Sequence, residues 1–319
     1  MSRYPEKPLD FSALRTIPIA ERGGKVKIEA FASPPQKGGD MIAFLAGLPH
    51  ILAGDSLRAV IEAIIRARDS KRAIIWGLGG HVIKCGLAPV LIDLMERGFA
   101  TEFAMNGAAA IHDFEIAVAG ATSEDVEAVL PDGRFGSAEE TGREMNAALD
   151  YAFHHDMGAG EAYGHRVVQL ARPEFRNFSL LYAAYQNLTP VTVHIAVGTD
   201  TPHTHPGATG AHIGAATHRD FRLFATLVEQ LEGGGVYLNL GSAVVLPEVF
   251  LKAVSVVRNL GAPLADFTTV NIDFIQHYRP KTNVVERPHA GGTGQGYSLT
   301  GHLELLLPLI AAALVECEE

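Results

Sequence analysis

The chain has 319 residues, which allows one large domain or two small ones. Hydrophobic residues make up 47% and charged residues 19%, a composition that supports a buried core and excludes a largely disordered chain. With 26 basic and 36 acidic residues the net charge is −10, so the global positive field of a nucleic-acid-binding protein is missing. Two counts stand out: 33 glycines and 14 histidines.

The cysteine content and the apolar segments indicate the compartment. Cys85 and Cys317 cannot form a disulfide framework, which is typical of a reducing environment. The first 31 residues contain no apolar core of a signal peptide, and the apolar stretch 303–315 is too short to span a bilayer. We therefore expect a cytoplasmic protein with neither a membrane nor a nucleic acid as partner.

The order of helix and strand patterns predicts the fold. Residues 1–45 are rich in Pro, Gly and Lys and are typical of an N-terminal arm that contacts another subunit. In residues 46–319 we expect strands at 73–76, 101–105, 191–197, 236–240 and 267–275. Helices are expected at 56–69, 82–97, 108–119, 137–155, 178–187, 217–232, 247–259 and 299–315. This alternation predicts a single α/β domain with a Rossmann-like, doubly wound, mostly parallel sheet.

Such a sheet binds its ligands beyond the carboxyl ends of the strands, where this sequence places most of its glycines. The run Gly77-Leu78-Gly79-Gly80 follows one predicted strand and precedes a helix, so its backbone could approach a pyrophosphate. The dinucleotide fingerprint is incomplete, because Val82 occupies its last glycine position. A plain tight turn is the alternative.

Two groups of histidines suggest chemistry. His112 is followed by Asp113, a carboxylate that could orient it as a general base, although a satisfied structural pair is an equal alternative. His203 and His205 could aim two imidazoles at one point if the backbone is extended, and Asp200 would add a carboxylate to a zinc or iron site. The alternatives for that loop are contact with an organic ligand or an inert, proline-stiffened surface.

Cationic side chains concentrate in the loop 276–296, which follows a buried strand. Arg279 suits bidentate capture of a carboxylate or phosphate, and the length of the loop favours a lid or a ligand contact. Solvated surface charge is the alternative. Glu248 follows Pro247 at a predicted helix start, where an acidic residue also complements the helix dipole.

The order of these motifs resembles the deoxyhypusine synthase family over residues 52–314. The resemblance rests on AIIWGLGGHVIKCG, NGAAAIHDFEIA, PVTVHIAVGTD, VYLNLGSAVVLPEVFLKA and HLELLLPLIAAAL. It implies a homotetramer with a Rossmann-like sheet that uses NAD to transfer a butylamine group from spermidine through an imine on a lysine. It also implies NAD contacts at Gly79, Gly80, His81, Asn106, Gly107, Asp113, Thr199, Asp200, Gly241, Ser242 and His302.

The sequence departs from the family in its polyamine pocket. The position of the family's essential histidine falls near Glu248, and the Gly-rich piece 291–296 contains no lysine for an imine. Arg279 and its basic neighbours replace carboxylates that would hold a polyamine. We therefore expect NAD-dependent group transfer on a small substrate other than a simple polyamine.

The expected catalytic groups come from several of these loops. They are His112, Asp113, Asp200, His203, His205, Glu248 and Arg279. A His-ligated, metal-dependent hydrolase and a non-catalytic ligand-binding relative are the alternatives.

Overall fold

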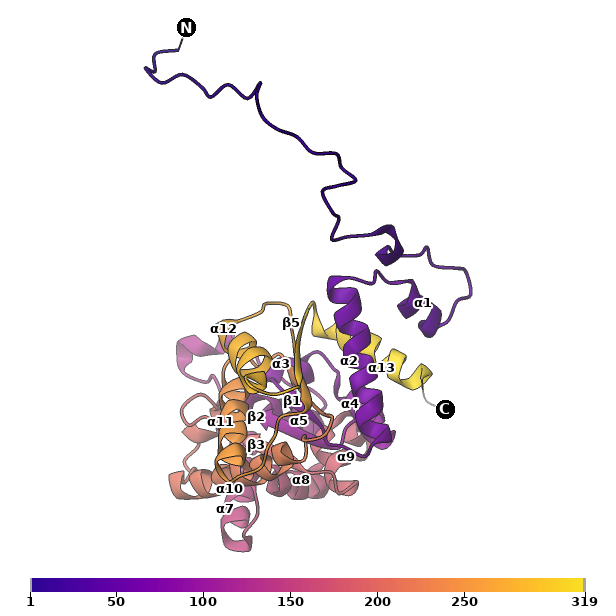
Figure 1. Ribbon diagram of the computed structural model, residues 1–319. Coiled ribbons are helices and arrows are strands. Elements are labelled where there is room, and N and C mark those ends of the chain that lie inside the picture. Colours follow the sequence, from indigo (N-terminus) through magenta and orange to yellow (C-terminus); the bar gives the residue numbers. More distant parts are fainter. Residues whose placement is uncertain (1, 318–319) are drawn as a thin grey trace.

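The computed structural model describes residues 2–317 and is built around one six-stranded sheet (Figure 1). The strands are β1 (Ile74–Leu78), β2 (Glu102–Asn106), β3 (Val191–His194), β4 (Gly235–Leu240), β5 (Phe267–Asp273) and β6 (Gln295–Thr300). All five neighbouring pairs are parallel, and the spatial order is β3-β2-β1-β4-β5-β6. This is the order of dinucleotide-binding Rossmann folds, so the predicted fold class is confirmed.

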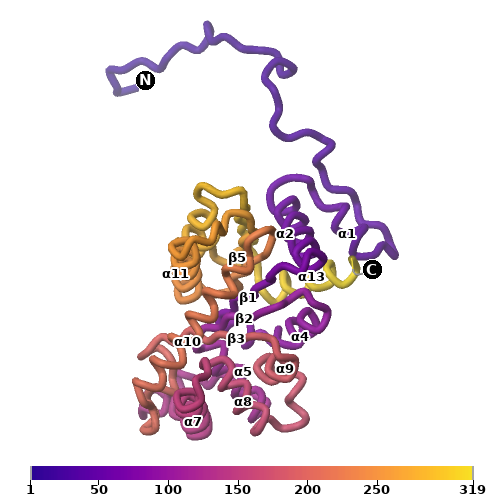
Figure 2. Tube along the Cα trace, turned by 60° about the horizontal axis from the view of Figure 1, so that its bottom comes forward, coloured from indigo at the N-terminus to yellow at the C-terminus, as the bar shows by residue number. Residues whose placement is uncertain are grey.

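Helices cover both faces of the sheet, which explains the continuous apolar strands. Every residue of β1 and β4 is buried. One core includes Trp76, whose indole N–H donates to the Phe99 carbonyl at 2.9 Å, and the opposite core includes Ile75 and Tyr237. Figure 2 shows the sheet between these two helical layers, with α10 and α11 on one side and α2, α4, α9 and α13 on the other.

The main helices include every helix that the sequence predicted, with several changes in their bounds, and two that it did not predict, at 126–129 and 159–170. They are α2 (Leu52–Asp69), α3 (Gly80–Lys84), α4 (Ala88–Glu96), α5 (Gly107–Ala119), α6 (Val126–Val129), α7 (Glu139–His155), α8 (Ala159–Leu170), α9 (Leu180–Gln186), α10 (Gly210–Glu229), α11 (Val245–Asn259) and α13 (Leu303–Glu316). The predicted helix 82–97 is two helices, because Gly86 between them has φ +75°. The predicted start at Thr217 is wrong: α10 begins at Gly210, and the Thr217 hydroxyl donates to the Val193 carbonyl on β3.

The segment 276–296 is not the open loop that the sequence predicted. It contains α12 (Tyr278–Pro280), a π-helical turn (Lys281–Glu286) and a 3-10 turn (Arg287–His289), and it ends in β6. Asn283 and Val284 are buried. This packing anchors the segment against the body of the protein, which argues against a freely moving lid.

Residues 2–40 extend away from the sheet (Figure 1). They contain only a 3-10 turn at Ile28–Ala30, and α1 (Met41–Gly47) then packs near α13. Large apolar side chains of this segment are exposed, among them Leu9 and Ile19. Within residues 2–317, no helix is both long enough and apolar enough to cross a membrane.

Candidate functional site

A cavity of about 550 Å³ lies at the carboxyl edge of β2 and β3. Its size is within the range of small-molecule sites, roughly 300–1,000 Å³. The ionisable side chains that line it are Lys84, His112, Glu115, Glu124 and Asp200, and Thr122 and Thr199 add hydroxyl groups. The cavity therefore joins the helix that follows β2 to the loop that follows β3.

Asp200 reaches this cavity across Gly107, the first residue of α5. A Cβ atom on Gly107 would overlap the Asp200 carboxylate, so only glycine allows this close approach. The carboxylate accepts hydrogen bonds from the Ala196 backbone N–H and the Thr199 hydroxyl, both at 3.3 Å. Burial raises the pKa of Asp200, an effect that these bonds and the nearby His203 oppose.

His112 is oriented by the Thr122 hydroxyl, in the loop after α5, and through it by the Glu115 carboxylate on α5. Its Nδ1 lies 2.7 Å from the Thr122 hydroxyl oxygen, and that hydroxyl donates to Glu115. Because a hydroxyl has one proton and a carboxylate only accepts, Nδ1 of His112 is the protonated nitrogen. Burial, with the positive charge of Lys84, lowers the pKa of His112 to about 4. At neutral pH the imidazole is therefore uncharged, and Nε2 is available as a base.

Asp113, which follows His112 in sequence, points elsewhere. Adjacent residues on a helix differ in direction by about 100°, and the Asp113 carboxylate faces α9. It accepts from the Ser179 hydroxyl at 2.6 Å and from the backbone N–H groups of Leu180 and Leu181 at 2.7 and 3.0 Å. The expected His112–Asp113 pair is therefore absent from the described residues: Asp113 caps α9, and Thr122 with Glu115 orients His112.

The glycine turn lies between β1 and β4, where the strand order reverses. Gly79 precedes α3, and no side chain caps the first turn of that helix. A Cβ on Gly79 would overlap the Gly241 carbonyl of the turn after β4, so the two turns pack backbone against backbone. A Cβ on Gly80 would lie 3.3 Å from Cδ2 of His112. The turn therefore adjoins the imidazole that lines the cavity.

Other residues expected to contact the cofactor have local structural contacts. The Asn106 side chain caps α5 by accepting from the Ala109 N–H at 2.9 Å, and the buried Ser242 hydroxyl accepts from the Leu246 N–H at 3.2 Å. The Thr199 hydroxyl, which lines the cavity, shares its one proton between the Asp200 carboxylate and the Ala196 carbonyl oxygen, which lies 2.8 Å away. His302 is exposed and stacks on Phe274. Asn106 and Ser242 thus shape the turns that follow β2 and β4.

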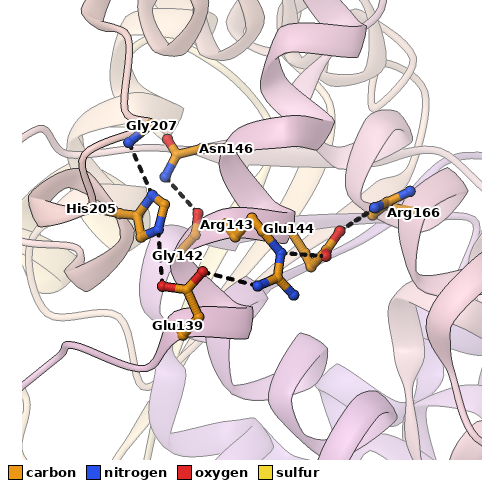
Figure 3. A network of polar contacts seen from close by, with 8 residues as sticks. All are labelled: Glu139, Gly142, Arg143, Glu144, Asn146, Arg166, His205 and Gly207. Atoms are coloured by element: carbon orange, nitrogen blue, oxygen red, sulfur yellow. Dashed lines mark hydrogen bonds and ion pairs between the residues drawn. The ribbon is translucent and has the colours of Figure 1, made fainter.

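His203 and His205 do not converge on a shared point. Nδ1 of His203 accepts from the Gly198 N–H, whereas His205 turns toward α7, where its Nε2 lies 3.5 Å from a Glu139 oxygen (Figure 3). The backbone between them forms a 3-10 turn rather than the extended conformation that the sequence suggested. In the described part of the chain, neither histidine belongs to a group of three side chains suited to a metal ion.

Glu248 and Arg279 contact each other rather than the cavity. The Arg279 guanidinium lies 3.3 Å from Glu248, which also pairs with Lys252 and accepts from Asn283 at 2.9 Å. These side chains lie on α11 and the helical segment after β5. The lining of the cavity includes neither Glu248 nor Arg279.

Among the cavity residues that escaped the sequence interpretation are Lys84, Glu115, Thr122 and Glu124. Glu115 carried a weak signal, because it lies three residues after His112 and therefore on the same face of the helix. Thr122 lies beyond the end of that helix, and Lys84 looked like an ordinary helix residue. Only the folded chain brings these side chains together.

Comparisons with known proteins find the same type of fold in several solved structures. No family model matches the sequence, and no curated protein matches it either. A LOR/SDH-type protein of Methanococcus maripaludis has a TM-score of 0.52 and 18% identity, over 83% of this chain and 70% of its own. A deoxyhypusine synthase-like protein of Entamoeba histolytica has a TM-score of 0.51 and 12% identity, over 88% and 94%.

A further similar structure is ArgZ, an arginine dihydrolase of the cyanobacterial ornithine-ammonia cycle. Its TM-score is 0.51 at 18% identity, over 84% of this chain and 34% of ArgZ. The chain thus spans about a third of the length of that enzyme. These likenesses support the Rossmann-like α/β fold and include one protein of the deoxyhypusine synthase-like type.

Proposed function

We propose that this protein is an NAD-dependent enzyme that oxidises a small zwitterionic substrate as the first half of a group transfer, with His112 as the general base. The observation that carries the proposal is the position of His112. Its ring lines the cavity and adjoins Gly80 of the turn between β1 and β4. This position supports a role as a base between a dinucleotide at the turn and a substrate in the cavity.

The glycine turn fits the phosphates of a dinucleotide. The first backbone N–H groups of α3 have no side-chain cap, and the turn lies where the strand order reverses, which is the ligand position in dinucleotide-binding sheets. The residue at the end of β2 is Asn106 rather than an acidic residue, so this chain lacks the usual ribose contact at that position. When bound, NAD would supply a hydride acceptor for oxidation of the substrate.

His112 would remove a proton from the substrate. Its neutral state and its protonated Nδ1 leave Nε2 as the accepting nitrogen. Glu115, which accepts from the Thr122 hydroxyl, would stabilise the positive charge of the imidazolium that forms. This arrangement holds the neutral ring in the tautomer that has a free Nε2. The base therefore needs no rearrangement before it accepts a proton.

The charges of the cavity support a substrate that carries both signs. Asp200 and Glu124 would attract an ammonium group, while Lys84 would attract a carboxylate or another anion. A polyamine has no group for Lys84. Arg279 lies with Glu248 outside the cavity lining, so the proposal assigns it no contact with the substrate.

Calorimetry with NAD tests the cofactor, and formation of NADH with small amino acids and with polyamines tests the substrate class. We expect NAD to bind and amino acids to give the faster NADH formation. Gly80→Ala should weaken NAD binding, because its Cβ would lie 3.0 Å from the Ala108 Cβ, whereas Gly210→Ala meets no atom within 4 Å. Failure of the wild-type protein to bind NAD would overturn the proposal, and binding without turnover of any compound would favour a non-catalytic relative.

A further inference from the structure

Three side chains with different donor atoms meet beside the glycine turn. His81 and Cys85 are four residues apart at α3, and Glu304 comes from the first turn of α13, 219 positions after Cys85. The His81 Nε2 lies 3.2 Å from the Cys85 sulfur, which lies 3.9 Å from a Glu304 oxygen. One ligand atom from each residue falls within 4.8 Å of the others. The fold therefore brings an imidazole, a thiol and a carboxylate to one place.

The two shorter separations, 3.2 and 3.9 Å, are close to the edges of a tetrahedral metal site. Zinc binds sulfur at about 2.3 Å and nitrogen or oxygen at about 2.0–2.2 Å, which sets ligand atoms roughly 3.3–3.8 Å apart. Small side-chain rotations would bring the three atoms here to such distances. Cys85 is half-buried while His81 and Glu304 are exposed, so an ion can enter from solvent.

The choice of donors favours zinc over the harder cations. Calcium and magnesium prefer oxygen ligands, whereas zinc and cobalt readily accept sulfur and imidazole nitrogen. Three protein ligands leave a fourth coordination position, as in zinc sites that hold a water molecule. The Cβ of His81 lies 3.9 Å from where a Cβ on Gly241 would be, so the group borders the turn after β4.

We propose that His81, Cys85 and Glu304 form a binding site for zinc or a similar divalent transition metal ion, with water in the fourth position. This site is separate from the expected hydrolase centre at His203 and His205, and it needs no dinucleotide. The thiol becomes a thiolate when the ion binds, and the released proton passes to solvent.

Cobalt substitution tests the site, because a thiolate bound to Co²⁺ gives a sulfur-to-metal charge-transfer band in the near ultraviolet. The full-length protein is stripped with a chelator and titrated with Co²⁺ without added NAD. We expect one equivalent of Co²⁺ to produce the band and one equivalent of Zn²⁺ to abolish it. Absence of the band in the folded wild-type protein would overturn the proposal.

Variants identify the ligands. Cys85→Ser should lose the band, whereas Cys317→Ser, which changes the other thiol of the chain, should keep it. Glu304→Gln should weaken Co²⁺ binding at least about tenfold, since even residues outside the first coordination sphere contribute 10–100-fold. Because Glu304 is exposed, this variant should fold normally even if Cys85→Ser does not. A band that survives Cys85→Ser but disappears in Cys317→Ser would refute the assignment.

A second group, Asp150, His154 and His212, is the main competitor for metal in the described chain. It contains no sulfur, so Co²⁺ bound there gives no thiolate band. His212→Ala should therefore leave the intensity of the band at saturating Co²⁺ unchanged. A band lost in this variant would also contradict the proposed site.

Discussion

Two histidines in opposite halves of the sheet share nearly the same electrostatics but have different surroundings. His112 follows β2, and His289 precedes β6; burial lowers the pKa of each to about 4. Each has one ring nitrogen 2.7 Å from a threonine hydroxyl oxygen, Thr122 for His112 and Thr269 for His289. The local chemistry of the two rings is therefore closely matched.

The two histidines differ in the surroundings of the other ring nitrogen, which is Nε2 in His112 and Nδ1 in His289. His112 lines the cavity beside Gly80, whereas Nδ1 of His289 is buried against Gly294, where a Cβ would lie 2.7 Å away, and has no hydrogen-bond partner in the described residues. Burial and a nearby cation, Lys84 for His112 and Arg258 for His289, lower both pKa values, so a lowered pKa does not by itself identify a base. Access to a cavity and to the glycine turn makes His112 the candidate base.

The largest expected effect on kcat/KM comes from replacing His112, and the same replacement at His289 is the comparison. His112→Asn should reduce kcat/KM for NADH formation by about 10²–10⁴, the usual contribution of a general base. The matched change His289→Asn should leave kcat/KM within a few-fold of the wild-type value. Steady-state kinetics on the best amino acid substrate measures both, and equal losses would remove the distinction between the two halves.

A smaller effect is expected from a change that moves Asp200 without altering its charge. In Gly107→Ala the new methyl group would overlap the Asp200 carboxylate and displace it from the cavity. We expect kcat/KM to fall up to about 100-fold, because a displacement of about 1 Å can have that cost. Gly210→Ala, also at the first residue of a helix, is the control and should have wild-type kinetics. Unchanged kinetics in Gly107→Ala would exclude a role for Asp200 in the cavity.

The sequence predicted the fold well where strands are continuously apolar. The strands around Ile75 and Leu238 were found within a residue or two, because burial on both faces leaves an unbroken apolar run. β6 was missed, since Gly296 and four partly or fully exposed neighbours give an edge strand no such signal. Periodicity thus located the central strands but not the edge strand.

The site was predicted less completely than the sheet. His112 and Asp200 were singled out because they follow strands, a position that topology alone makes meaningful. The position after a strand does not reveal the partners of His112. Its neighbour in sequence, Asp113, suggested a pair, but adjacent residues on a helix point in different directions. The His81–Cys85–Glu304 group was missed for a related reason: two of its members lie 219 residues apart.

The two histidine variants should differ in their kinetics but not in the number of protons that the chain takes up on unfolding. Both histidines have the same lowered pKa and therefore contribute equally to that number. Their folded pKa of about 4 lies below the ordinary value of 6.5, so between these pH values the unfolded chain binds more protons and stability rises with pH. At about pH 5, His112→Asn and His289→Asn should each reduce proton uptake by about one proton. Calorimetric unfolding in buffers of different ionisation enthalpy measures this, and a change in only one variant would contradict the shared cause.

The smallest effect is expected on the opposite side of the sheet, at Glu248. Its ion pairs with Lys252 and Arg279 are partly exposed, and such pairs contribute about 0–1 kcal/mol. Glu248→Ala should therefore lower the free energy of unfolding by no more than about 1 kcal/mol in denaturant titrations, and kcat/KM should not change. Glu62→Ala, which removes the exposed pair with Arg66 on α2, is the matched control for stability. A tenfold loss of kcat/KM in Glu248→Ala would instead extend the site to α11, where the deoxyhypusine synthase family has its essential histidine.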